Sequence, residues 1–128
     1  YPLLREAGLL IVYVRLSGPK GHRLIRLALD TGATTTMVPP HALLAIGVNP
    51  AKVSSYHETL TASSRELIPL VVVPELRVFE TTFRRVALAC HELPSESPVD
   101  GLLGLDLLTR LNAALDFTKP CLRLPEKK

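Results

Sequence analysis

The chain contains Leu24-Ile25-Arg26-Leu27-Ala28-Leu29-Asp30-Thr31-Gly32-Ala33, an apolar run that leads directly into an acidic turn. The run predicts a strand, which the turn formers at residues 17–21 would connect to an earlier strand at residues 9–16. Gly32 allows close backbone approach, and the Thr31 hydroxyl can bind neighbouring backbone groups. The turn therefore presents the Asp30 carboxylate outward from a rigid support, although a plain β-turn at a strand end would read the same way.

A second motif lies further along the chain and reads Asp100-Gly101-Leu102-Leu103-Gly104-Leu105-Asp106-Leu107-Leu108. Its leucines recur at helical spacing, which predicts a short amphipathic helix over residues 105–111. Taken alone, the Asp-Gly pair is an ordinary turn and the leucines are an ordinary helix face. The occurrence of both motifs, in this order, is more informative than either one.

The rest of the chain alternates short apolar stretches with turn-forming residues. Further strands are predicted at residues 34–38, 53–61, 66–73, 76–79, 86–90, 113–117 and 122–124, and a second short helix at residues 41–46. Many short strands separated by turns favour a closed barrel or a sandwich over an alternating α/β sheet. We expect a mostly β fold with one or two short helices, in a single domain over residues 1–128.

The composition argues against disorder, nucleic-acid binding, metal binding and membrane-spanning segments. Hydrophobic residues make up 47% of the chain and charged residues 21%, which suits a folded core rather than disorder. The net charge of +3 comes from scattered basic residues without interleaved aromatics, so we expect no nucleic-acid partner. Cys90, Cys121 and the histidines lack metal-ligand spacing, so neither a metal nor another cofactor is expected. The apolar runs are far shorter than the roughly 20 residues that span a bilayer.

The two motifs together resemble the active-site segments of retropepsin-like aspartic proteases. In that family an apolar pair precedes Asp-Thr-Gly-Ala, as Ala28 and Leu29 do here, and a later apolar-apolar-Gly segment passes behind the active-site loop. The resemblance covers about residues 9–124 and is closest to the single-domain prokaryotic members. It implies a closed β-barrel of the acid-protease type and an enzyme that hydrolyses peptide bonds.

The same resemblance implies a homodimer. The chemistry of the family uses two carboxylates that share one proton: one activates a water molecule, and the other, protonated, hydrogen-bonds the scissile carbonyl. The chain has a single Asp-Thr-Gly, so the second carboxylate is expected from Asp30 of another subunit across a two-fold axis. An intramolecular pair with Asp100, Asp106 or Asp116 stays open.

The resemblance also assigns roles to other residues that contact substrate or the partner subunit. Thr31 would reach across the two-fold axis, and Gly32 would offer backbone contacts near the substrate. The tip formed by Thr61, Ala62, Ser63 and Ser64 occupies the place of the flap that closes over bound peptide. Family flaps usually carry a Gly at this tip, whereas this chain has two serines.

An extended apolar groove and a terminal interface complete these expectations. Val38, Val72 and Leu102 are candidate walls of a groove that would receive a peptide as an added strand. In retroviral relatives the subunits interleave their termini in a shared sheet, so residues 1–5 and 121–124 are candidates for the dimer interface.

Three functions remain open from the sequence. The chain is an active homodimeric peptidase acting on peptide or protein substrates, a catalytically silent or conditional dimerisation or peptide-binding module of the same fold, or an unrelated β-barrel binding protein. The intact Asp30-Thr31-Gly32 favours the first, because an inert module has no need of the carboxylate. We therefore predict an aspartic endopeptidase that is most active at acidic to mildly acidic pH and insensitive to chelators and thiol reagents. Nothing in the sequence identifies its compartment.

Overall fold

A computed structural model describes residues 1–60 and 65–125. Its central hairpin joins β2 (Leu9–Gly18) to β3 (Gly21–Leu29). In β2 the buried Val14 and Leu16 alternate with the exposed Tyr13 and Arg15, the period-2 pattern of a strand with one face in a core. The hairpin predicted from the sequence is confirmed, and its turn is shorter than expected because both strands extend into residues 17–21.

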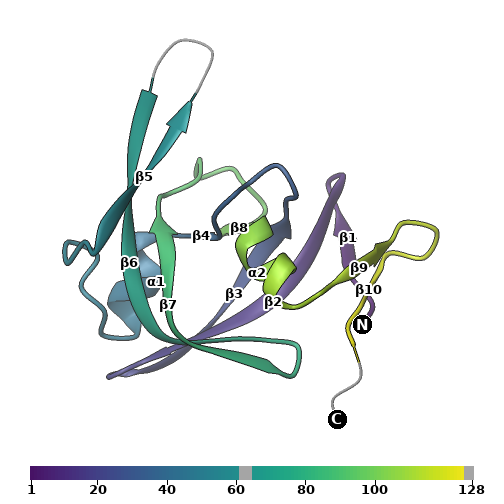
Figure 1. Cartoon of the computed structure of the whole chain (residues 1–128), viewed down its shortest axis with the longest axis horizontal. Helices are drawn as coiled ribbons and strands as arrows, with labels where there is room; N and C mark the ends of the chain where they lie inside the picture. Colours follow the sequence, from purple (N-terminus) through teal and green to yellow (C-terminus); the bar gives the residue numbers. More distant parts are fainter. Residues whose placement is uncertain (61–64, 126–128) are drawn as a thin grey trace.

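Six strands close into a barrel, which confirms the closed β-barrel that the resemblance implied. The strands run in the order β2, β3, β8 (Gly101–Leu103), β4 (Met37–Val38), β7 (Thr81–Cys90) and β6 (Arg65–Val78), and pairing of β6 with β2 closes the ring. β1 (Leu4–Glu6) extends the sheet beside β2, and β5 (Ser55–Leu60) extends it beside β6. The β5–β6 hairpin rises from the barrel at the upper left of Figure 1.

Strand β6 is longer than the sequence predicted. Two separate strands were expected at residues 66–73 and 76–79, and Pro74 between them cannot donate a ladder hydrogen bond. Instead β6 continues through Pro74, and the register with β7 steps from Val73–Val86 to Glu75–Arg84. Arg85, which lies opposite the skipped proline, has a φ of 50°. One irregular residue on each strand thus accommodates the proline without ending the strand.

Two short helices flank the barrel. Helix α1 (Pro40–Ala45) begins at a proline, whose fixed φ suits a first turn, and ends before Gly47, whose φ is +83°. Helix α2 (Leu105–Arg110) follows β8 directly. Both predicted helices are confirmed within one residue at each end, whereas the strand predicted at residues 34–38 is reduced to β4.

The core fills the interior of the barrel. The largest side chains with almost no exposed surface include Leu16, Leu27, Leu43, Leu76, Leu88 and Leu103. They come from β2, β3, α1, β6, β7 and β8, so every part of the ring contributes to one core. Among the described residues, none of the helices is long and apolar enough to cross a membrane.

A small terminal sheet lies beside the barrel, at the right of Figure 1. It pairs β9 (Ala114–Asp116) with β10 (Cys121–Arg123), and Pro2 bridges to Cys121 on the other edge of β10. The Leu3 N–H donates to the Pro120 carbonyl at 2.8 Å. Residues 1–3 are therefore joined to residues 120–122 within one subunit.

Candidate active site

Asp30 stands on a tight loop at the end of β3. Its backbone N–H donates to the Leu103 carbonyl at 2.9 Å, which fixes the start of the loop against β8. Its Oδ1 accepts a hydrogen bond from the Gly32 N–H at 2.8 Å, and its carbonyl accepts one from the Ala33 N–H at 3.2 Å. The loop thus holds the Asp30 carboxylate through its own backbone.

Strand β8 supports this loop from behind because two glycines let the backbones approach closely. A Cβ at Gly101 would overlap the Met37 carbonyl oxygen, and one at Gly104 would lie 2.8 Å from the Ala33 carbonyl oxygen. β8 runs parallel to β3, with Leu29 opposite Leu103. The apolar-apolar-Gly segment therefore passes behind the Asp30 loop, as predicted.

A buried hydroxyl locks the far end of the loop to helix α2. Thr36 has no exposed surface, and its N–H and Oγ1–H donate to Oδ1 of Asp106 at 3.0 and 2.7 Å. The same Oγ1 accepts a hydrogen bond from the Gly104 N–H at 3.0 Å. Every polar group of the Thr36 side chain is thereby satisfied by the second sequence motif.

We expect Asp106→Ala to lower the free energy of unfolding by about 2–4 kcal/mol, because it leaves the buried N–H and hydroxyl of Thr36 without an acceptor. Asp106→Asn keeps an oxygen at Oδ1 and should cost under about 1.5 kcal/mol. Urea unfolding of the parent and both variants checks this difference. Equal losses for the two variants would contradict a role for the carboxylate oxygen as the acceptor.

A cleft of about 460 Å³ opens beside the Asp30 carboxylate. It is lined by Asp30, Gly32, Ala33, Thr34, Thr35, Met37, Glu58, Ile68, Ala89 and Leu102. The floor is mainly apolar, and the β5–β6 hairpin supplies one wall. Among the predicted groove walls, Leu102 lines this cleft, while Val38 is fully buried in the core and Val72 is exposed elsewhere on β6.

Comparison with known proteins identifies the family. A family model described as aspartyl protease matches residues 12–107, a range that includes the Asp30 loop, the cleft and the start of α2. The chain belongs to this aspartyl protease family. No curated protein sequence matches it significantly.

Two solved structures support a retropepsin-like fold for this chain. A retropepsin-like aspartic protease from Rickettsia conorii superposes with a TM-score of 0.65 and 16% identity, over 90% of this chain and 82% of that one. The retroviral protease-like domain of Ddi1 from Leishmania major superposes with a TM-score of 0.62 and 18% identity, over 91% and 87%. At these identities the likeness concerns the fold.

The other site residues predicted from the sequence lie in different places. Gly32 lines the cleft with Asp30, whereas Thr31 is exposed and lines a separate cavity beside α2 and the terminal sheet. The predicted flap tip, residues 61–64, lies outside the described residues. The sequence analysis missed Glu58 as a cleft residue, because only the pairing of β5 with β6 brings it near Asp30.

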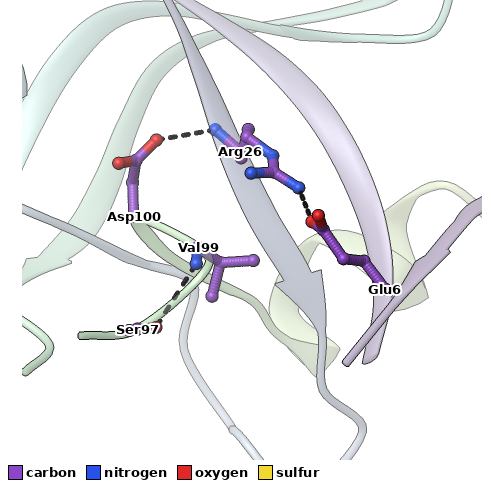
Figure 2. Close-up of polar contacts among 5 residues, drawn as sticks. All are labelled: Glu6, Arg26, Ser97, Val99 and Asp100. Carbon is purple, nitrogen blue, oxygen red and sulfur yellow. Dashed lines mark hydrogen bonds and ion pairs between the residues drawn. The ribbon is translucent and has the colours of Figure 1, made fainter. Parts of the chain in front are cut away.

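The three carboxylates considered as intramolecular partners of Asp30 each accept hydrogen bonds elsewhere in the fold. Figure 2 shows Asp100 directed toward β3, where its Oδ2 accepts from the Arg26 N–H at 2.9 Å. The Arg26 guanidinium also forms an ion pair with Glu6, which ties β1 to β3. Asp106 binds Thr36, and Asp116 accepts from the N–H and hydroxyl of Thr118.

Metal-ligating clusters and reactive thiols are two other kinds of catalytic site that a chain can carry. Across residues 1–60 and 65–125, no group of three or more His, Cys, Asp or Glu side chains is arranged to hold a metal ion. Cys90 is buried, and desolvation raises the pKa of its thiol. Because a thiolate rather than a thiol is the reactive form, Cys90 is unsuited to act as a nucleophile at neutral or acidic pH.

Proposed function

We propose that the chain is one subunit of a homodimeric aspartic endopeptidase, with residues 1–128 forming one protease domain. Asp30 of each subunit supplies one carboxylate of a shared dyad on the two-fold axis. A water molecule held between the two carboxylates attacks the scissile carbonyl of a bound peptide. Membership of the aspartyl protease family supports the reaction class.

The observation that carries this proposal is the placement of Asp30. Its carboxylate stands at the edge of an apolar-floored cleft, on a loop held by Leu103 from behind and by its own Gly32 N–H. Asp100, Asp106 and Asp116 are engaged in hydrogen bonds that fix β3, Thr36 and the β9–β10 turn. A second copy of Asp30 is therefore the best source of the second carboxylate.

The dyad works because two nearby carboxylates retain one proton between them. The ionised member takes a proton from the attacking water, and the protonated member donates a hydrogen bond to the carbonyl oxygen as charge develops on it. The tetrahedral intermediate then collapses, and the leaving amine takes a proton from the dyad. Activity is expected to decline toward neutral pH, where the shared proton is lost.

Peptide substrates would bind in an extended form. The cleft is bounded on one side by the β5–β6 hairpin, and its floor offers Met37, Ala89 and Leu102 to apolar side chains. Residues 61–64 at the end of this hairpin are proposed to close over the peptide, with Gly32 contacting its backbone. Thr31 is proposed to brace the loop of the partner subunit.

Glu58 tests the proposal because it is the other acidic residue that lines the cleft. If Asp30 from two subunits forms the dyad, Glu58→Gln should cleave a peptide library within about threefold of the parental rate across about pH 4 to 7. A loss as deep as that of an Asp30 variant would identify Glu58 as the second carboxylate and overturn the shared dyad. Absence of cleavage by the parent across this range would contradict the endopeptidase assignment.

A further inference from the structure

A second, mainly apolar cavity also borders the Asp30 loop, at Leu29 and Thr31. This cavity of about 340 Å³, here called the α2 groove, lies between the loop, helix α2 and the terminal sheet. Its apolar lining consists of Leu29, Leu105, Leu108, Ala113, Leu115 and Leu122. Thr31, Thr109 and Asn112 supply polar groups to the same cavity. An apolar hollow with polar groups at its edge has the composition of a protein-binding pocket.

The position of the α2 groove relates it to the proposed dimer. A dyad on a two-fold axis requires the loops carrying Asp30 to meet, so Thr31, the next residue, must lie at or near the interface. Thr31 lines the α2 groove. Leu105, at the start of α2, leaves 40% of its surface exposed in the single subunit. The groove is thus continuous with the surface that a second copy has to cover.

The chain also carries a large apolar side chain that is mostly exposed in the single subunit. Phe117 follows β9 and is 74% exposed, the highest value among the large exposed hydrophobic residues of the described chain. The turn that holds it is ordered by Asp116, whose Oδ1 accepts from the Thr118 N–H at 2.9 Å and the Thr118 hydroxyl at 2.5 Å. These hydrogen bonds also lower the pKa of Asp116, so the turn keeps its acceptor at mildly acidic pH.

Within the described residues, the terminal sheet offers no free edge of β10 to which a strand of a second copy could add. Both edges of β10 are paired within one chain, to β9 on one side and to the segment around Pro2 on the other. A partner strand cannot add to β10 without displacing one of them. Figure 1 shows the β9–β10 hairpin extending away from the barrel, which makes its turn available to a neighbouring molecule.

We propose that Phe117 of each subunit inserts into the α2 groove of the other. The inference rests on the homodimer of the proposed function and specifies how its subunits hold together. Two-fold symmetry makes the contact reciprocal, so each dimer contains it twice. Each insertion buries an aromatic ring among leucines next to Thr31, and so couples subunit association to the positioning of both Asp30 loops.

Two single variants test the two halves of this contact. Phe117→Ser removes the inserted ring, and Leu105→Asp places a charge in the α2 groove that receives the ring. Each should raise the dimer dissociation constant about tenfold or more in sedimentation velocity, because both copies of the contact are lost. Leu44→Ser is the matched control, since Leu44 is 60% exposed on α1, and it should leave the constant unchanged.

A mixture of the two variants separates this contact from a general loss of stability. A Phe117→Ser subunit keeps its groove and a Leu105→Asp subunit keeps its ring, so the mixed dimer regains one contact. At a concentration where each variant alone is monomeric, the mixture should form dimers and recover cleavage. Failure of the mixture to associate more than either variant would overturn the pairing.

Two further outcomes distinguish this inference from the proposed function. If the parent cleaves as a dimer and Phe117→Ser associates as tightly as the parent, the insertion is wrong while the peptidase assignment stands. If the parent is monomeric at all concentrations and still cleaves, the shared dyad and the insertion are both overturned. Normal far-UV circular dichroism of both variants is the required check of folding.

Discussion

Asp30→Asn should lower kcat/KM for peptide cleavage at least about a thousandfold, the largest effect expected from any single substitution in this chain. An amide in place of each carboxylate cannot take a proton from water, and the dyad loses both its base and its shared proton. The substitution is otherwise conservative, because an Asn oxygen can still accept the hydrogen bond that Asp30 receives from the Gly32 N–H. Steady-state assays at the parental pH optimum measure the loss.

The assignment of Asp30 as a catalytic group depends on the parent and the Asp30→Asn variant having the same fold and the same oligomeric state. Circular dichroism and the mass in solution should match, since the loop keeps its backbone contacts. Parental activity in the variant would show that Asp30 is not the catalytic group. If neither protein cleaves although both are folded dimers, the fold serves instead as a silent or conditional binding module.

Gly101→Ala should lower the free energy of unfolding by more than about 3 kcal/mol, or prevent folding. An added Cβ would overlap the Met37 carbonyl oxygen and meet the Leu27 side chain at 3.1 Å. The obstructing atom belongs to backbone, so the clash can be relieved only by moving β8 away from β4. That movement would also withdraw the support that β8 gives to Asp30. Urea unfolding, with soluble yield as a second readout, measures the effect.

Gly8→Ala is the matched control for this substitution. Gly8 has a φ of +79°, and a Cβ there would meet nothing within 4 Å. The control therefore carries the cost of a left-handed conformation, about 1–2 kcal/mol, without a steric clash. If Gly101→Ala proves no less stable than Gly8→Ala, close approach of β8 to β4 is not required for the fold.

The features that sequence reasoning predicted well depend on neighbours along the chain. The β2–β3 hairpin is encoded by apolar alternation and adjacent turn formers, and α1 by a proline at its start and Gly47 at its end. Two strands were predicted in place of β6, on either side of Pro74, a residue that cannot donate a ladder hydrogen bond. The positive φ of Arg85 on the neighbouring strand β7 accommodates Pro74. The sequence of β6 alone does not reveal that Arg85 lies opposite this proline.

In the candidate site, too, the parts formed by neighbouring residues were predicted and the parts formed by distant residues were not. The Asp30 loop and the segment behind it were predicted because each is a contiguous motif. Glu58 and Ile68 could not be assigned to the cleft, because their approach to Asp30 depends on how the β5–β6 hairpin leans over the barrel. The pairing of residues 1–3 with residues 120–122 was likewise not predicted, since it joins residues more than a hundred positions apart.

The shared dyad is tested most directly by adding inactive Asp30→Asn protein to a fixed amount of parent under conditions that allow subunit exchange. Because mixed dimers hold a single Asp30, random pairing with about a ninefold excess of the variant should leave about a tenth of the parental cleavage. Activity that stays proportional to the amount of parent, despite demonstrated subunit exchange, would contradict a catalytic site built from two subunits.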